Sequence, residues 1–131
     1  MNIPRNKKAG FSLVEVLAAV AIIGIIAFLA LPNIVAIKDE SEIHLAISRA
    51  EAANMAMVSF IQSRGRATAV SEWSDADSVQ EQYALLAPYL AFAPTEIGDY
   101  MPSGYTIELP NSLSSLSKVV LKDPADAAIS Y

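Results

Sequence analysis

The stretch that decides the fold is residues 7–40, KKAGFSLVEVLAAVAIIGIIAFLALPNIVAIKDE. Its apolar part, from Phe11 to Ile37, contains one charged residue, Glu15, close to its start. This apolar part is longer than the about 20 residues that a helix needs to cross a bilayer core, and longer than the about 7–15 apolar residues of a cleavable secretory signal. It therefore predicts a membrane-spanning helix with its basic flank in the cytoplasm.

The composition limits what the rest of the chain can be. With 131 residues the chain holds one small domain, and without cysteine it has neither disulfides nor a thiolate metal site. The net charge is -5, although three of the nine basic residues precede the apolar part (Arg5, Lys7 and Lys8). The remainder is therefore more acidic still, which argues against nucleic acid as a partner because a nucleic-acid surface needs excess positive charge.

Glu15 needs its own explanation, because a charge within a membrane helix costs about 2.5–3.5 kcal/mol on insertion scales. If the chain is cut after Gly10, Phe11 gains an α-amino group that is largely protonated at neutral pH. Glu15 lies four residues further on, one helical turn along the same face. In a staggered assembly of parallel helices, Glu15 of one chain could meet the amine of the next chain and fix the register of the two.

The motif KKAG followed by FSLVEVLAAVAIIGIIAFLALPNI resembles the leader and N-terminal helix of type IV pilins and type II secretion pseudopilins. This resemblance implies that prepilin peptidase cuts after Gly10 and N-methylates Phe11. It also implies that Glu15 is the acidic residue used in assembly. The basic residues of the leader match Arg5, Lys7 and Lys8.

Pro32 interrupts the apolar part and matches a helix-interrupting proline of the same family. Proline removes one backbone donor and costs about 3 kcal/mol in a helix interior, and Gly24, about two turns earlier, adds backbone flexibility. Residues 24–32 are therefore expected to be the weakest part of the helix. The resemblance implies that this segment could unwind on assembly, whereas the residues alone allow a mild kink of no consequence.

The sequence predicts an α+β, pilin-like fold. One long N-terminal helix, with an apolar half and an amphipathic half, packs on a small C-terminal head with a short helix and a two- or three-stranded antiparallel sheet. The expected divisions are a leader (1–10), a membrane and filament-core segment (11–37), an amphipathic segment (38–64) and the head (65–131). The amphipathic segment has an apolar stripe with one polar position, namely Ile43, Ile47, Ala50, Asn54, Met57 and Ile61.

Within the head, residues 63–75 read as a loop, and Ser78 to Glu81 form a capping-box pattern that starts a helix through Leu86. Pro88 should end or bend this helix. Strands are expected at 105–109 and 117–122, with a short third strand from 128 to 131.

No cluster of residues predicts catalysis, so we expect no enzyme activity and no cofactor. His44 is the only histidine and reads as a surface residue near Glu40 and Ser48. Acidic residues in turns could offer oxygen ligands to calcium, although they lack a recognisable calcium motif; these are Asp75, Asp77, Asp123 and Asp126. Two arginines, Arg64 and Arg66, make a weak case for phosphate binding.

The resemblance implies a filament subunit that pairs with copies of itself, with prepilin peptidase and with an inner-membrane assembly platform and its ATPase. The chain would cross the bacterial inner membrane once, with its N-terminus cytoplasmic, and then enter a periplasmic or extracellular filament. The presence of Glu15 favours a subunit that repeats along the filament. The short head favours the major pseudopilin of a secretion system slightly over the subunit of a surface pilus. The alternative is a secreted or membrane-anchored binding protein with an ordinary anchor or signal, cut near Ala30.

Overall fold

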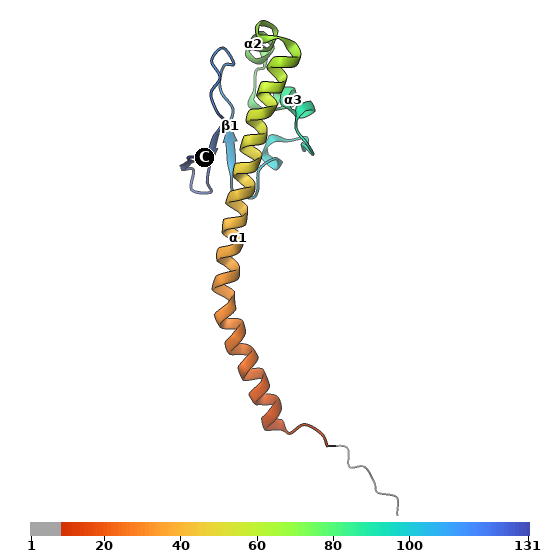
Figure 1. Cartoon of the computed structure of the whole chain (residues 1–131), viewed down its shortest axis with the longest axis vertical. Coiled ribbons are helices and arrows are strands. Elements are labelled where there is room, and N and C mark those ends of the chain that lie inside the picture. Colours follow the sequence, from red (N-terminus) through yellow and green to blue (C-terminus); the bar gives the residue numbers. More distant parts are fainter. Residues whose placement is uncertain (1–8) are drawn as a thin grey trace, which may run out of the picture. The chain divides into compact units, whose positions relative to one another are not determined.

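The computed structural model of the chain describes residues 9–131, so the predicted leader residues Arg5, Lys7 and Lys8 lie outside the described part. Its main element is helix α1, Leu13–Arg64, which has 52 residues and confirms the predicted long N-terminal helix (Figure 1). The chain divides into two compact units, one ending at Asp39 and the other comprising Glu40–Tyr131. The first unit holds the apolar part of α1, and the second holds the remainder of α1 with the head.

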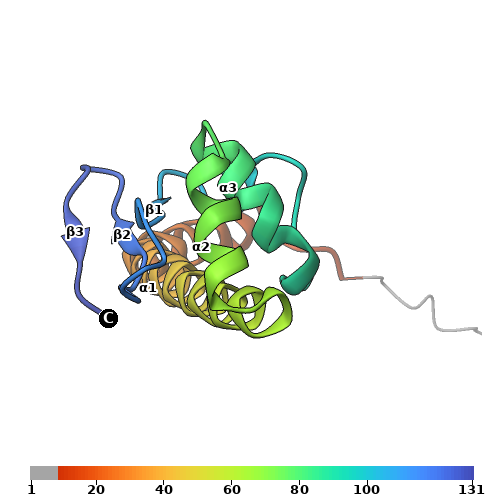
Figure 2. The same cartoon turned by 90° about the horizontal axis from the view of Figure 1, so that it is seen from above.

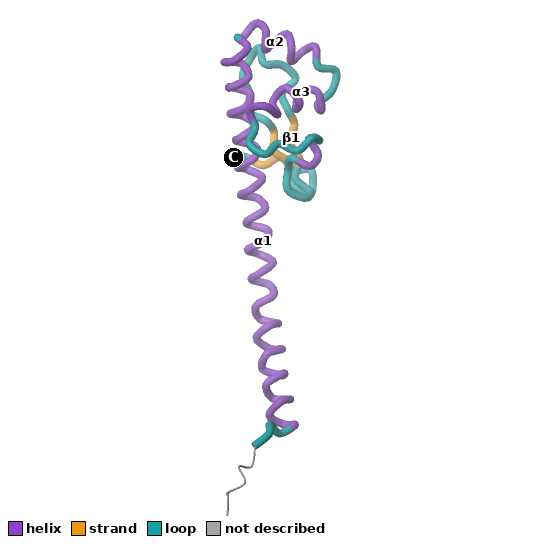
Figure 3. Tube along the Cα trace, turned by 90° about the vertical axis from the view of Figure 1, so that its right-hand side faces the viewer, coloured by secondary structure: helices purple, strands orange, loops and turns teal. Residues whose placement is uncertain are grey.

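The head follows α1 in the order of two α-helices, two 3-10 helices and three strands. The helices are α2 (Arg66–Asp75), α3 (Val79–Leu86), η1 (Ala87–Tyr89) and η2 (Ile97–Asp99). In the second unit, the sheet lies to one side of α1 and the pair α2 and α3 lies to another (Figure 2). Much of the head is loop, and its strands are short (Figure 3). The architecture is α+β and pilin-like, as predicted.

Helix α2 corrects the prediction that residues 63–75 form a loop. Gly65 has a φ of 81°, a conformation that glycine adopts without steric cost. This residue interrupts the helical backbone, so α1 ends before it and α2 begins after it. Two positions four residues apart, Ala69 and Trp73, are fully buried and supply the apolar face of the new helix. Packing of this face therefore makes a helix of a segment whose polar composition resembles a loop.

Helix α3 begins as its capping box predicted. The hydroxyl of Ser78 accepts a bond from the backbone N–H of Glu81 at 3.2 Å. The carboxylate of Glu81 accepts from the backbone N–H of Asp77, at 2.7 Å. The helix ends at Leu86, and the proline at position 88 lies inside the 3-10 turn η1 that follows. The prediction of a helix that Pro88 ends is confirmed.

The sheet has three antiparallel strands in the order β1-β2-β3, which are Thr106–Glu108, Val120–Lys122 and Ala128–Ile129. Ile107 pairs with Leu121, and Leu121 pairs with Ile129, so these apolar side chains share one face. Leu121 on the central strand is fully buried. The strands lie inside the predicted ranges.

The head completes its core with residues of α1. The buried face of the amphipathic half consists of small residues followed by large ones, namely Ala46, Ala50, Ala53, Ala56, Met57 and Phe60. The predicted stripe shares two of these positions, Ala50 and Met57, whereas its isoleucines lie at the edge of the buried face. Small side chains line the centre because alanine lets the head loops approach the helix backbone closely.

Trp73 lies in the middle of this core. Its indole Nε1–H donates to the carbonyl oxygen of Pro110 at 2.8 Å, so the buried polar group has a partner. Its ring lies 6.3 Å from that of Phe60, which in turn meets the ring of Tyr89 at 6.1 Å. Helix α2 is thus held between α1 and the loop after β1.

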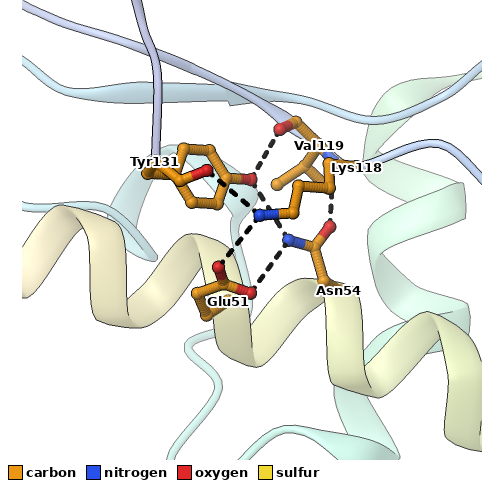
Figure 4. A network of polar contacts seen from close by, with 5 residues as sticks. All are labelled: Glu51, Asn54, Lys118, Val119 and Tyr131. Carbon is orange, nitrogen blue, oxygen red and sulfur yellow. Dashed lines mark hydrogen bonds and ion pairs between the residues drawn. The ribbon is translucent and has the colours of Figure 1, made fainter.

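A polar network, here called the clasp, joins α1 to the end of the head; it consists of Glu51, Asn54, Lys118, Val119 and Tyr131 (Figure 4). The side-chain oxygen of Asn54 accepts from the backbone N–H of Val119 at 2.9 Å, and its NH₂ group donates to the Tyr131 hydroxyl at 3.2 Å. That hydroxyl donates to the carbonyl of Val119 at 2.6 Å. Asn54, the one polar position in the predicted apolar stripe, is therefore the residue that anchors the clasp.

Lys118 closes the outer side of the clasp. Its ammonium lies 3.2 Å from the carboxylate of Glu51, donates to the backbone oxygen of Tyr131 at 3.1 Å, and lies 4.7 Å from the centre of the Tyr131 ring. Both partners of the ion pair are about half-exposed, so the pair contributes well under 1 kcal/mol. The hydrogen bonds of the Asn54 side-chain amide are partly buried, so they contribute more to the stability of the clasp.

A second junction links α1 to the loop after η2. The guanidinium of Arg49 donates to the carbonyl of Tyr100, and the hydroxyl of Tyr100 donates back to the carbonyl of Arg49 at 2.9 Å. Burial raises the pKa of the Tyr100 phenol, with the nearby Tyr83 phenol adding to the rise and the Arg49 charge opposing it. Burial likewise raises the pKa of Tyr83.

Candidate functional site

The beginning of α1 is held by a reciprocal pair of bonds between Ser12 and Glu15. The backbone N–H of Ser12 donates to Oε2 of Glu15 at 2.8 Å, and the backbone N–H of Glu15 donates to the hydroxyl of Ser12 at 3.1 Å. The carbonyl of Ser12 accepts from the N–H of Val16 at 3.2 Å, the first bond of the helix. This arrangement is a capping box with Ser12 at the N-cap.

The capping box gives Glu15 a role that the sequence reasoning missed. The S-x-x-E signature that predicts the start of α3 at Ser78 is also present at Ser12, where the long apolar run around it masks the signal. A carboxylate at this position also meets the positive end of the helix dipole. The chain therefore has a local reason to keep an acid at the start of an apolar helix, and the pairing of Glu15 with a neighbouring amine stays a prediction.

Gly10 and Phe11 precede the helix in non-helical backbone. Both are exposed, and the side chain of Phe11 is 90% exposed. A Cβ at Gly10 would meet no atom within 4 Å. The bond between these two residues therefore lies in an accessible segment outside regular structure, where proteolytic cleavage is favoured.

The apolar part of α1 exposes nearly all of its side chains. By length and composition α1 could cross a membrane, and none of its apolar stretch is buried inside the chain. The large exposed residues surround the helix on every side and are Leu13, Val14, Val16, Leu17, Val20, Ile22, Ile23, Ile25, Ile26, Phe28, Leu29, Leu31, Ile34, Val35 and Ile37. A helix that is apolar all round requires lipid or other apolar helices around it.

The segment with Gly24 and Pro32 is helical in this chain. Pro32 lies inside α1, and a Cβ at Gly24 would meet nothing within 4 Å. The proline leaves the carbonyl of Phe28 without its usual helical donor. Unwinding of residues 24–32 on assembly remains a prediction about the filament.

The other candidate residues serve the head itself. The carboxylate of Asp123 accepts from the backbone N–H groups of Ala125 and Ala127, each at 2.9 Å. Asp126 lies 3.3 Å from the ammonium of Lys122. Among the described residues, no group of three or more His, Cys, Asp or Glu is placed to hold a metal ion. The acids proposed as calcium ligands in the last turn are thus engaged in shaping that turn.

The arginines and the histidine also have local partners. Arg64 lies 3.7 Å from the carboxylate of Glu72 on α2, and Arg66 donates to the carbonyl of Ser114 at 2.5 Å. His44 lies 3.9 Å from the carboxylate of Glu40, and both side chains are exposed. His44 is thus a surface residue beside Glu40, as the sequence indicated.

Comparison with known families places the N-terminal features in context. Residues 5–31 match the family model described as the prokaryotic N-terminal methylation motif. This motif is characteristic of type IV pilins and pseudopilins, so the chain carries the N-terminal signature of that family. It supports a type IV pilin-like protein of the prepilin-processed class, and together with the apolar helix it is consistent with anchoring in the inner membrane. Neither a curated protein nor a solved structure matches the chain.

Proposed function

We propose that this chain is the structural subunit of a type IV pilus or a type II secretion pseudopilus. In this proposal prepilin peptidase cuts after Gly10, N-methylates Phe11, and the product polymerises through α1. The observation that carries the proposal is the methylation motif at residues 5–31, which coincides with an exposed cleavage bond and with a helix whose apolar side chains lack cover. The role is structural rather than catalytic, and it requires no cofactor.

Polymerisation through α1 would bring the exposed apolar surfaces of neighbouring helices together. Lipid covers this surface well, so moving it among apolar helices gains little hydrophobic energy. Packing can hold the helices together, but apolar packing alone leaves their axial register weakly defined. A charged pair in an apolar environment defines register strongly, because displacement leaves each charge unpaired. Glu15 is the charge within the apolar part that can provide such a pair.

The capping box specifies how this pair would form. In the uncut chain Oε2 of Glu15 accepts from the backbone of Ser12, which leaves Oε1 available for a second donor. Cleavage creates an ammonium group on Phe11, next to Ser12. In the filament, we infer that Oε1 of Glu15 meets this ammonium group on the neighbouring chain. The capping box then holds the carboxylate in place instead of competing for it.

The expected partners are those that the resemblance to pilins implies. Copies of the chain bind through α1, and prepilin peptidase binds the segment around Gly10. An inner-membrane assembly platform and its ATPase supply the energy to extract the helix from lipid. The chain first spans the inner membrane once, with the leader in the cytoplasm, and then enters a periplasmic or extracellular filament.

The first experiment determines the N-terminus of the mature chain by mass spectrometry. A chain that begins at Phe11 and carries one added methyl group supports the proposal. A chain that begins near Leu31, after a cut at Ala30, would instead support an ordinary signal peptide and a secreted binding protein. An uncut chain would support a simple membrane anchor. Gly10→Val should block the cut, whereas Gly24→Val, within the helix, should leave it unchanged.

The second experiment tests polymerisation. Glu15→Ala should leave cleavage at Gly10 largely intact but remove filaments from the fraction sheared off the cells. Glu15→Gln, which keeps the shape and one acceptor for Ser12 but loses the charge, separates the capping role from the charge pair. Normal filaments in Glu15→Gln would contradict the charge pair. Deletion of the gene then distinguishes a pilus, whose loss removes surface filaments, from a pseudopilus, whose loss stops enzyme secretion.

A further inference from the structure

Phe92 projects from the head in an unusual way. It lies in the loop between η1 and η2, its side chain is fully exposed, and its backbone has a φ of 56°. Bulky residues rarely adopt this left-handed conformation, because Cβ approaches the backbone too closely. The side chain gains no contact within its own chain that would offset this conformation. A Gly or Asn would suit the position better if the turn alone mattered.

The same head contains an apolar pocket of about 130 Å³. Its lining consists mainly of apolar side chains, among them Val79, Ile97, Met101 and Ile107. An apolar cavity of about 150 Å³ in a protein core is known to hold a benzene ring, so this pocket is close to the size of a phenyl group. Val79 at its rim is half-exposed, which leaves apolar surface that an incoming ring would cover.

We propose that Phe92 of one copy inserts into this pocket on the head of the next copy. This inference rests on the proposed function, because it supplies a head-to-head contact within the filament. In this arrangement each copy inserts its ring into the copy on one side and receives the ring of the copy on its other side. The contact then continues from copy to copy, whereas reciprocal insertion between two copies would close a pair.

Charge favours an apolar contact between the heads. The chain has 14 acidic and nine basic residues, and exposed Glu96 and Asp99 flank the pocket residues Ile97 and Gly98 in the sequence. Heads with excess negative charge repel one another, so ion pairs are a poor means of joining two copies. Insertion of a ring into an apolar pocket needs no opposite charge.

Cysteine cross-linking tests the contact, because the chain has no cysteine of its own. One cysteine replaces Ala91, beside the projecting ring, and a second replaces Thr106 or Gly98 at the pocket. The full-length double variants are made in cells that assemble filaments and are oxidised with copper phenanthroline. We expect a ladder of cross-linked multimers, because each chain offers both halves of the contact. Each single variant should give no species larger than a dimer.

Two controls show that the ladder reports the proposed contact. Adding Phe92→Ala to the double variant should reduce the multimers by about tenfold or more, because burial of the ring is lost. Phe92→Leu, which keeps an apolar side chain, should retain part of the ladder. Moving the second cysteine from the pocket to Leu116, which is exposed elsewhere on the head, should abolish the ladder.

The outcomes separate this inference from the proposed function. Filaments without a ladder in both double variants would refute the Phe92 contact and leave the subunit role intact. A fast-migrating cross-linked monomer would show that the ring fills the pocket of its own chain, and a cross-linked dimer without larger species would show reciprocal insertion; either result also refutes the contact. Absence of filaments from cells with the unaltered chain would refute the subunit role itself. Because Phe92 contacts nothing in its own head, Phe92→Ala should leave thermal unfolding, followed by Trp73 fluorescence, unchanged.

Discussion

Gly104→Ala should be among the most damaging single-methyl changes in the head. Gly104 has a φ of 85°, and an added Cβ would lie 2.9 Å from Cγ and 3.1 Å from Cβ of Pro124. The proline ring cannot move away easily, because Asp123 holds the turn around it through bonds to two backbone N–H groups. The substitution therefore combines an unfavourable backbone conformation with an overlap against a fixed neighbour.

The two effects have separable magnitudes. The left-handed conformation costs an alanine about 1–2 kcal/mol, and overpacking costs about 1–3 kcal/mol. The free energy of unfolding of the head should thus fall by roughly 2–5 kcal/mol, and each kcal/mol lowers the unfolding midpoint by about 4–8 °C in a domain of this size. In a Pro124→Ala background, where Cγ is gone, Gly104→Ala should cost about 1 kcal/mol less.

Fluorescence of Trp73 provides the assay. It is the only tryptophan in the chain and is fully buried, so its emission reports unfolding of the head in the full-length protein in detergent micelles. Gly98→Ala is the matched control, because its Cβ would meet nothing within 4 Å and its φ is not positive. The reasoning is refuted if Gly104→Ala destabilises the head no more than Gly98→Ala does, or if its cost is the same with and without Pro124.

Three further predictions use the same protein. Asn54→Leu should lower the free energy of unfolding by about 1–3 kcal/mol, because the backbone N–H of Val119 loses its acceptor. Asn54→Asp keeps an oxygen at this position and should cost less, so equal losses of stability in the Trp73 assay would contradict the role of that hydrogen bond. Ser12→Ala should weaken the start of α1 by about 0.5–2 kcal/mol and speed amide exchange at Glu15 in micelles, without preventing the cut after Gly10; unchanged exchange would count against the capping box. Burial raises the pKa of Tyr100 in the folded head, so the phenol of the unfolded chain ionises first and the stability of the head should fall as the pH rises above about 10. Tyr100→Phe should make this decline less steep in alkaline unfolding curves, and an equally steep decline would exclude Tyr100 as its source.

The features predicted correctly from the sequence are those with strong local signals. The apolar run gives α1, the capping box at Ser78 gives α3, and the strands follow from two short segments around Ile107 and Leu121 that a turn-forming segment joins. These signals are carried by neighbouring residues, so they depend little on how distant parts of the chain pack. The methylation motif is equally local, because all of it lies within residues 5–31.

The features that were missed depend on packing between distant segments. Helix α2 owes its formation to the burial of Trp73 under a loop that lies 37 residues away. The buried face of α1 is set by how closely the head loops approach Ala46 and Ala50, which hydrophobic periodicity does not reveal. At the N-terminal site, by contrast, the capping box of Ser12 and Glu15 is written in the sequence, and an explanation based only on charge overlooks it.

The clasp has a consequence for the order of events during biosynthesis. Asn54 and Tyr131 are 77 residues apart, so a ribosome must translate that whole interval before the two can meet. The apolar part of α1, which ends near Ile37, is synthesised well before then. The clasp therefore closes late in synthesis, because a chain that stops short of Tyr131 lacks the hydroxyl that bonds Asn54 and Val119.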